Sequence, residues 1–126
     1  MPRTAIPVVD IPVYNAGVGG FSKLTFVVSD STNNHEIAND GRTMIVAQNS
    51  TVGASSATVI SVNDEYGRVG NIAWTLPGYD SASFNSISVA GPFRVPHFNQ
   101  AGGRLLNLDT PASTAFRFAG FRLPIN

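Results

Sequence analysis

Apolar and polar residues alternate along most of the chain, in short runs that turn residues separate. In residues 21–28, Leu24, Phe26 and Val28 fall on one side, and Lys23 and Thr25 fall on the other. This period of two is the pattern of a β-strand that buries one face. Residues 21–28 are therefore predicted to form a strand.

Similar runs recur towards the C-terminus. Turn residues separate them at intervals of roughly 8 to 12 residues, a spacing typical of sandwiches and barrels. No window shows apolar residues at helical spacing without Gly, Pro or β-branched interruptions. We therefore predict an all-β fold for a single domain of residues 21–126, an antiparallel β-sandwich or a jelly-roll-like barrel. The expected later strands are residues 43–49, 55–62, 69–76, 84–89, 103–108 and 113–123, and residues 93–98 would add an eighth short strand to the fold.

The strand at residues 43–49 follows a tight turn. Asp40-Gly41 is a strong turn signal, since Gly accepts positive φ at little cost and Asp can bond its own nearby backbone. Met44 and Val46 then fall on one side of the strand, and the residues between them fall on the other. We expect a structural corner at Asp40, Gly41 and Arg42, with Arg42 pairing a carboxylate, and a strand that buries at least one face.

Two further local expectations concern residues 29–41 and the last run. Residues 29–41 are mostly polar and are expected to form a loop. In the last run Phe116 and Phe118 share a face, and Gly120 suggests a bulge. The two phenylalanines are therefore predicted to lie in the core.

The first 20 residues differ from the rest of the chain. Pro2, Pro7 and Pro12 each remove a backbone donor, so the segment cannot be a helix or a central strand. It is nevertheless apolar, which is unusual for a disordered tail. One interpretation is an extended Pro-rich N-terminal arm, residues 1–20, that adds to a neighbour's open sheet edge. The alternative is an edge strand of its own domain. The expected partner-binding residues of the arm are Pro7, Val8, Val9, Ile11, Val13 and Tyr14.

Charge and cysteine content narrow the classes of function. Eight basic and eight acidic side chains balance, which gives no electrostatic case for nucleic acid or an anionic membrane. Only 13% of residues are charged, against a typical value of about 25%. The absence of cysteine excludes disulfides and thiolate metal sites. No apolar run is long enough to span a membrane or to serve as a signal peptide, so we expect the chain to be made in the cytoplasm of whatever cell makes it.

Candidate catalytic groups are few. His35 is expected to be a solvated loop side chain, and His97 follows a proline without a neighbouring nucleophile motif. Asp64 and Glu65 are adjacent in a predicted turn, so they would point to different sides. The oxygen-rich residues 30–36 suggest at most a weak structural cation, because they lack the spacing of an EF-hand loop. We therefore predict no enzyme activity, no cofactor and no dedicated metal site.

Several short motifs occur in a recognisable order: NDGRT before a strand, DEYGR in a turn, then GPF, FNQ and a terminal FRL. This order, over about residues 36–123, resembles small β-rich virion proteins encoded near the major capsid protein in tailed bacteriophages. The resemblance implies a head decoration (cement) protein, a homo-oligomer with a trimer favoured, that binds the major capsid protein on the capsid exterior and stabilises the head. The Pro-rich residues 1–20 have no counterpart in that pattern.

Two alternatives stay open at this point. The first is another virion component of similar fold, such as a neck, fibre-base or tail protein. The second is a carbohydrate-binding β-sandwich that stacks sugars on Trp74, Tyr79 or Tyr66, with Asn and Asp as hydroxyl partners. A buried Trp74 would argue against the second alternative.

Overall fold

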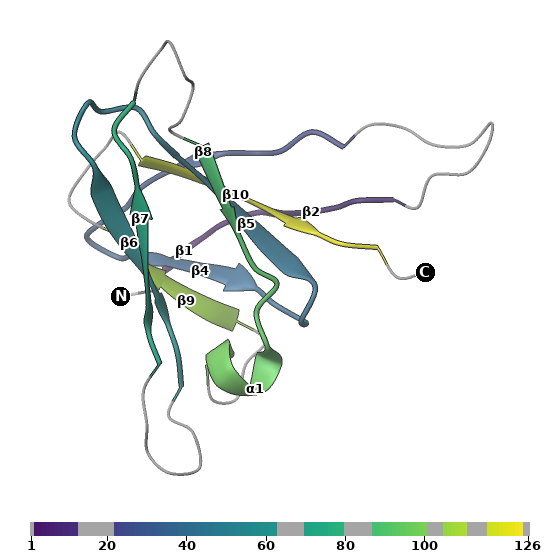
Figure 1. Ribbon diagram of the computed structural model, residues 1–126. Helices are drawn as coiled ribbons and strands as arrows, with labels where there is room; N and C mark the ends of the chain where they lie inside the picture. Colours follow the sequence, from purple (N-terminus) through teal and green to yellow (C-terminus); the bar gives the residue numbers. More distant parts are fainter. Residues whose placement is uncertain are drawn as a thin grey trace.

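The computed structural model describes residues 2–12, 22–62, 70–79, 87–100, 105–110 and 116–124. These residues form two five-stranded arrangements of β-strands and one short helix, α1 (Val95–Phe98). Figure 1 shows the two groups of strands and the single helical turn. The predicted all-β class is confirmed, but the strand expected at residues 93–98 is not formed, because Val95–Phe98 make the helical turn α1.

The first sheet, sheet A, has the order β1-β4-β9-β6-β7. Among the described residues, its only parallel pairing joins β1 to β4, and the other neighbours are antiparallel. Its strands are β1 (Thr4–Ala5), β4 (His35–Ala38), β9 (Leu105–Asp109), β6 (Ser55–Ile60) and β7 (Ile72–Leu76).

The second sheet, sheet B, has the order β2-β10-β5-β8, and β3 also pairs with β10. Strands β2 and β3 contact the same long strand at different positions, because β2 pairs with residues 120–122 and β3 with residues 117–118. The strands of sheet B are β2 (Val8–Asp10), β10 (Phe116–Arg122), β5 (Thr43–Asn49), β8 (Ile87–Ala90) and β3 (Val27–Val28).

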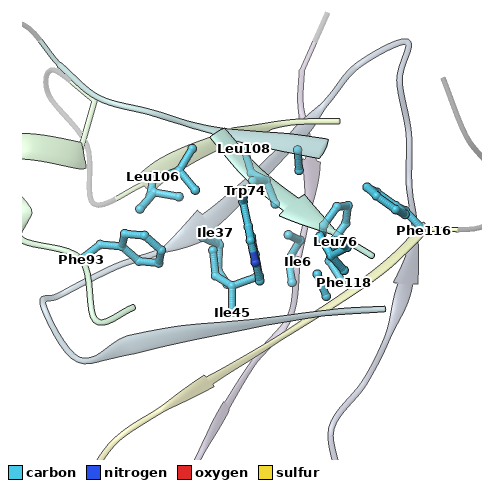
Figure 2. Packing of buried hydrophobic residues seen from close by; sticks show 13 residues of the cluster. Ile6, Ile37, Ile45, Trp74, Leu76, Phe93, Leu106, Leu108, Phe116 and Phe118 are labelled. Carbon is cyan, nitrogen blue, oxygen red and sulfur yellow. The ribbon is translucent and has the colours of Figure 1, made fainter. Parts of the chain in front are cut away.

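Side chains from both sheets meet in one hydrophobic core (Figure 2). Phe116 and Phe118 are fully buried, as predicted, and their rings lie 6.0 Å apart in an edge-to-face arrangement. Ile45 and Ala47 lie beside them on β5. Sheet A and its surroundings contribute Ile37, Val59, Trp74, Leu76, Phe93, Leu106 and Leu108.

The N-terminal segment pairs with its own domain. Thr4 and Ala5 lie beside β4 in sheet A, and β2 then lies beside β10 in sheet B. Between the two strands, the Ile6 side chain is buried in the core, as Figure 2 shows. Residues 4–10 are therefore edge strands of this domain, as the alternative interpretation expected, and not an arm free of it. The prediction of a free arm is corrected for this stretch.

The prediction of a loop over residues 29–41 is wrong in its middle part. Strand β4 lies between β1 and β9, and His35 and Ile37 point into the protein with almost no exposed surface. The sequence His-Glu-Ile-Ala alternates as a half-buried strand does, but a polar residue occupies one of the two inward positions. Because His35 is polar, the sequence pattern did not identify this strand.

Gly120 is also not a bulge. It pairs in regular register with Ile45 on one side and Val8 on the other. A Cβ atom at Gly120 would lie 2.5 Å from the Ile37 Cδ1 atom and 3.1 Å from the Pro7 carbonyl oxygen. Glycine is favoured here because a side chain would crowd Ile37 of β4 and the Pro7 carbonyl of the N-terminal segment.

Candidate interaction surface

The predicted corner at residues 40–42 is present and contacts the end of the N-terminal segment. Gly41 has a φ of 95°, a conformation that favours glycine. The Asp40 carboxylate accepts hydrogen bonds from Arg42 at 2.9 Å and from Arg122 at 3.1 Å, and Arg122 also pairs with Asp10 at 2.6 Å. The predicted carboxylate partner of Arg42 is thus its neighbour Asp40.

These ion pairs form a surface clamp. Desolvation opposes ionisation of Asp40, but hydrogen bonds from Arg122 and Arg42 keep the pKa of Asp40 below its usual value. Hydrogen bonds to Asp10 and Asp40 raise the pKa of Arg122. Exposed ion pairs of this kind contribute little stability. The clamp holds residues near the two chain ends together. Arg42 and Arg122, which an anionic ligand would need, are already paired with Asp10 and Asp40.

Among the residues expected to bind a partner, the structure places four. Pro7 is exposed, Val8 packs against the core, and Val9 and Ile11 are half-buried. The other two, Val13 and Tyr14, lie outside the described residues. The segment is held in place by main-chain bonds, such as the Ile11 N–H donating to the Arg122 carbonyl at 3.0 Å.

A second apolar face lies on the side of sheet B opposite the core. In β5, Ile45 and Ala47 belong to the core cluster, so by alternation Met44 and Val46 point to the other side. The same alternation and the strand register place apolar residues of β2, β3, β8 and β10 on that side. We call this the outer face of sheet B; its apolar residues are Val9, Val28, Met44, Val46, Ile87, Val89, Ala119 and Phe121.

The outer face of sheet B is apolar at its centre and at both edges. Val46 is 5% exposed and Ala119 is fully buried, although neither belongs to the core cluster. At the edges, Val28 is 50% exposed, Ile87 56% and Val89 52%. Polar side chains on this face come from Gln48 and Arg117, which are register partners. Sheet B is therefore apolar on both faces, the pattern of a sheet covered on both sides.

The outward side of sheet A differs. Its outward residues alternate with core residues such as Leu106 and Leu108, and most of them are polar or small. Apolar exceptions are Leu105, which is 37% exposed, and Ile60. The polar and small residues are Glu36, Ala38, Ser56, Thr58, Ala73, Thr75, Asn107 and Asp109. Sheet A thus presents a surface suited to water, and sheet B does not.

His35 is a structural residue and not the solvated loop side chain that the sequence suggested. The Asp30 N–H donates to the His35 Nε2 atom at 2.9 Å, so Nε2 carries no proton. The protonated Nδ1 atom lies 3.2 Å from the Thr4 carbonyl oxygen and donates to it. Burial lowers the pKa of His35. The neutral ring therefore joins β1 to the turn at Asp30.

Asp30 organises the turn that precedes β4. Its carboxylate accepts from the Thr4 hydroxyl at 2.6 Å and from the backbone N–H groups of Thr32 and Asn33. Hydrogen bonds from Thr4 and Asn33 lower the pKa of Asp30 to about 2. Both oxygens are thus engaged within the protein. In the described part of the chain, no group of three or more His, Asp or Glu side chains could hold a metal ion.

The aromatic residues of the carbohydrate alternative are not assembled into a platform. Trp74 is only 9% exposed, and its indole N–H donates to the Ser88 hydroxyl at 3.1 Å. Tyr79 is 40% exposed, and Tyr66 lies outside the described residues. A side chain so deeply buried cannot stack on a sugar ring. Its hydrogen bond to Ser88 instead links β7 at the edge of sheet A to β8 at the edge of sheet B.

The sequence showed that Met44 and Val46 lie on the same side of their strand. It did not show that this side belongs to a second apolar face. The signal was available, because residues 43–47 are apolar or β-branched at nearly every position, which is typical of a strand covered on both faces. One strand by itself does not reveal a surface, however. The outer face of sheet B became evident only when five strands were aligned in register.

Comparison of the chain with protein-family models, with curated proteins and with solved structures gave no match. Within residues 2–124, so far as they are described, no helix is long and apolar enough to cross a membrane.

Proposed function

We propose that this chain is a structural protein of a tailed-bacteriophage virion, a decoration (cement) protein that binds the lattice of the major capsid protein on the capsid exterior. The observation that carries the proposal is the outer face of sheet B. A second apolar face on a small domain with few charges is best accounted for by a large protein surface that covers it. The order of sequence motifs supplies the virion setting.

Leaving the edges of this face in water is costly, because Val28, Ile87 and Val89 are each half or more exposed. Monomeric proteins rarely expose contiguous apolar patches larger than a few hundred Å². Interface centres are depleted in charged residues and enriched in aromatic residues and Met. This face includes Met44 and Phe121, which are register partners, and Arg117, which lies on β10 between Val28 and Gln48. A repeating protein lattice would cover this face on each of the many copies of the chain that bind to it.

We infer a jelly-roll sandwich as the finer architecture. Strands β3 to β10 divide into two groups of four, with the spatial orders β3-β10-β5-β8 and β4-β9-β6-β7. Such an order arises when two Greek keys fold together, and jelly rolls built in this way occur in viral capsid proteins and in lectins. Strands β1 and β2 are then additions that close one side. The strand order supports both the fold expectation and the virion setting.

The two alternatives fare differently. A neck, fibre-base or tail protein could present the same outer face to another lattice, so the identity of the lattice must be tested. A lectin-like role would need an exposed aromatic platform, and the burial of Trp74 removes the principal candidate. We therefore retain the capsid lattice as the proposed partner.

The test is co-sedimentation of the purified protein with heads of the encoding phage from which this protein has been removed. We expect saturable binding at a stoichiometry related to the lattice symmetry. The variant Val28→Lys places a charge on the outer face at an exposed position, far from β8, and should bind more weakly. The matched control is Leu105→Lys on the outward side of sheet A, which should bind as the parent does.

Each outcome has a distinct meaning. If the protein stays in the supernatant with heads but sediments with isolated tails, the neck or tail alternative replaces the capsid proposal. If Val28→Lys and Leu105→Lys bind equally well, the outer face of sheet B is not the docking surface. Circular dichroism of both variants establishes that each is folded before binding is compared.

A further inference from the structure

One charged side chain lies on the outer face of sheet B. Arg117 of β10 is exposed, and it is the single ionisable residue at the outer positions of the described strands of that sheet. Its register partners are Val28 on one side and Gln48 on the other, and Gln48 pairs in turn with Ile87. The Arg117 guanidinium therefore belongs to a row of two apolar side chains and one amide.

Arg117 differs from most arginines of the described chain. Arg3, Arg42 and Arg122 each pair with an aspartate, at distances between 2.6 and 3.1 Å. Among the described residues, no acidic side chain pairs with Arg94 or Arg117. Arg94 precedes α1 and lies outside the strands of sheet B. Arg117 is thus a cation without an acidic partner on a face that is otherwise almost entirely apolar.

A surface that covers this face would remove the Arg117 guanidinium from water. A desolvated charge is strongly unfavourable unless it is paired and hydrogen-bonded. The guanidinium presents its donors as a planar fork that matches a carboxylate, and it is more weakly hydrated than an ammonium. The half-buried Gln48 lies directly across the strand pair, and its amide can donate a further N–H to the same carboxylate. Together the two side chains fit one carboxylate.

We propose that the surface which covers the outer face of sheet B carries an aspartate or glutamate within an apolar patch, and that this carboxylate binds Arg117 and Gln48. The inference rests on the proposed function and adds the chemistry of the partner, a side-chain carboxylate of the major capsid protein. Apolar residues such as Phe121 supply contact area but fit a partner in several positions. The ion pair fixes the position in which the two surfaces dock.

The first test measures binding of Arg117 variants to heads from which this protein has been removed. Arg117→Leu should weaken binding about thirtyfold or more, because the carboxylate of the partner is left buried without a cation. Arg117→Lys keeps the charge but loses the planar fork, so it should bind with intermediate affinity. Leu105→Lys, on the outward side of sheet A, is the control and should bind as the parent does. If no carboxylate faced Arg117, Arg117→Leu would bind as tightly as the parent or more tightly.

Urea unfolding of the free protein separates binding from folding. Because Arg117 makes no ion pair within the described chain, we expect Arg117→Leu to keep the urea midpoint of the parent. Reduced binding at unchanged stability assigns the arginine to the partner and not to the fold.

The sign of a charge placed beside Arg117 gives a second test. Val28→Glu and Val28→Lys put opposite charges at the register partner of Arg117. Both variants place a charge on an apolar face, but the glutamate would also pair with Arg117 and repel the carboxylate of the partner. Val28→Glu should therefore bind about fivefold more weakly than Val28→Lys, or weaker still. Equal binding of the two variants would show that no negative charge faces this position.

Carbodiimide coupling tests for the carboxylate directly. Lys23 is the single lysine of the natural chain, so Arg117→Lys adds one amine at a known position, and the parent protein gives the background. With heads at saturating protein concentration, carbodiimide should join that amine to an aspartate or glutamate of the major capsid protein. Mass spectrometry of the crosslinked peptides identifies the acid. Leu105→Lys should give no such crosslink.

Failure of this inference is distinguishable from failure of the lattice proposal. If the parent binds heads and Arg117→Leu binds as tightly, the face docks without a carboxylate, and the inference is overturned while the lattice proposal stands. A crosslink from Arg117→Lys to a second copy of this chain would also overturn it, because the carboxylate would not come from the lattice. If the parent does not bind heads, the proposed function fails, and the carboxylate inference fails with it.

Discussion

Val46 on β5 and Ala119 on β10 are register partners on the outer face of sheet B, and both are buried although neither belongs to the core cluster. Phe121, two residues after Ala119, is the aromatic member of that face and is half-buried. Phe121 pairs in register with Met44, and aromatic residues and Met are enriched at the centres of protein interfaces.

Truncation of Phe121 should therefore affect binding more than folding. We expect Phe121→Ala to weaken binding to the head lattice by roughly 2 kcal/mol, the size typical of an aromatic hot spot. Its loss of unfolding free energy should be smaller than that of a core phenylalanine. Binding titrations and urea unfolding of the same samples measure both, with Leu105→Ala as the control. Unchanged binding would place Phe121 outside the interface.

Truncation of a core phenylalanine should affect folding more than binding. Phe116 is fully buried against Phe118, so Phe116→Ala removes a large packed side chain and leaves a cavity. We expect a loss of about 3–5 kcal/mol in the free energy of unfolding. Phe26, which is 41% exposed, supplies the matched control, and Phe26→Ala should cost much less. Similar values for the two variants would contradict the observed core.

The close packing at Gly120 gives a test with a rescue. Gly120→Ala places a methyl group 2.5 Å from the Ile37 Cδ1 atom, so we expect a loss of about 1–3 kcal/mol. Ile37→Val removes that Cδ1 atom and should recover part of the loss in the double variant. Urea unfolding of the two single variants and the double variant measures the coupling. Additive losses would show that the Pro7 carbonyl, and not Ile37, is the obstacle.

The N-terminal segment should contribute to stability, contrary to the expectation for a free arm. Ile6 is 3% exposed and lies in the core cluster. We expect Ile6→Ala to lower the free energy of unfolding by about 2–5 kcal/mol. Pro2→Ala, at an exposed position of the same segment, should have little effect. If Ile6→Ala is neutral while lattice binding falls, the segment acts as a partner-binding arm after all.

Buried His35 predicts a fall in stability on mild acidification. Burial lowers the pKa of His35 in the folded protein, so below the unfolded-state value near pH 6.5 the unfolded chain binds the proton more readily. Stability is therefore complete above that pH and falls below it, by about 1.4 kcal/mol per pH unit until the folded state also titrates. Asp30 and Arg3 are the charged groups that act on the ring, and they oppose each other.

The measurement is urea unfolding at pH 7.5 and at pH 5, which stays above the range in which Asp30 titrates. His35→Asn should be less stable at pH 7.5 and should lose most of the pH dependence over this range. His97→Asn is the matched control and should retain the dependence. A dependence that survives in His35→Asn would assign it to another group.

Sequence reasoning succeeded where one strand's own pattern was sufficient. The alternation of Phe116 and Phe118, the turn at Gly41 and the runs that became β5, β6 and β7 follow from local rules of spacing and backbone freedom. Strand β4 was missed because its inward His35 is polar. Only the Thr4 carbonyl and the Asp30 N–H, which come from other segments, make that position favourable for a histidine.

The sequence by itself determined that this protein is built of short β-strands, with few charges and no cysteine, because period, turn residues and composition are properties of neighbouring residues. Tertiary structure decided the rest. The parallel pairing of residues 4–5 and 8–10 with their own sheets depends on contacts between residues far apart in the chain, and so does the second apolar face of sheet B. Register and sheet order bring those residues together, and no local pattern specifies either of them.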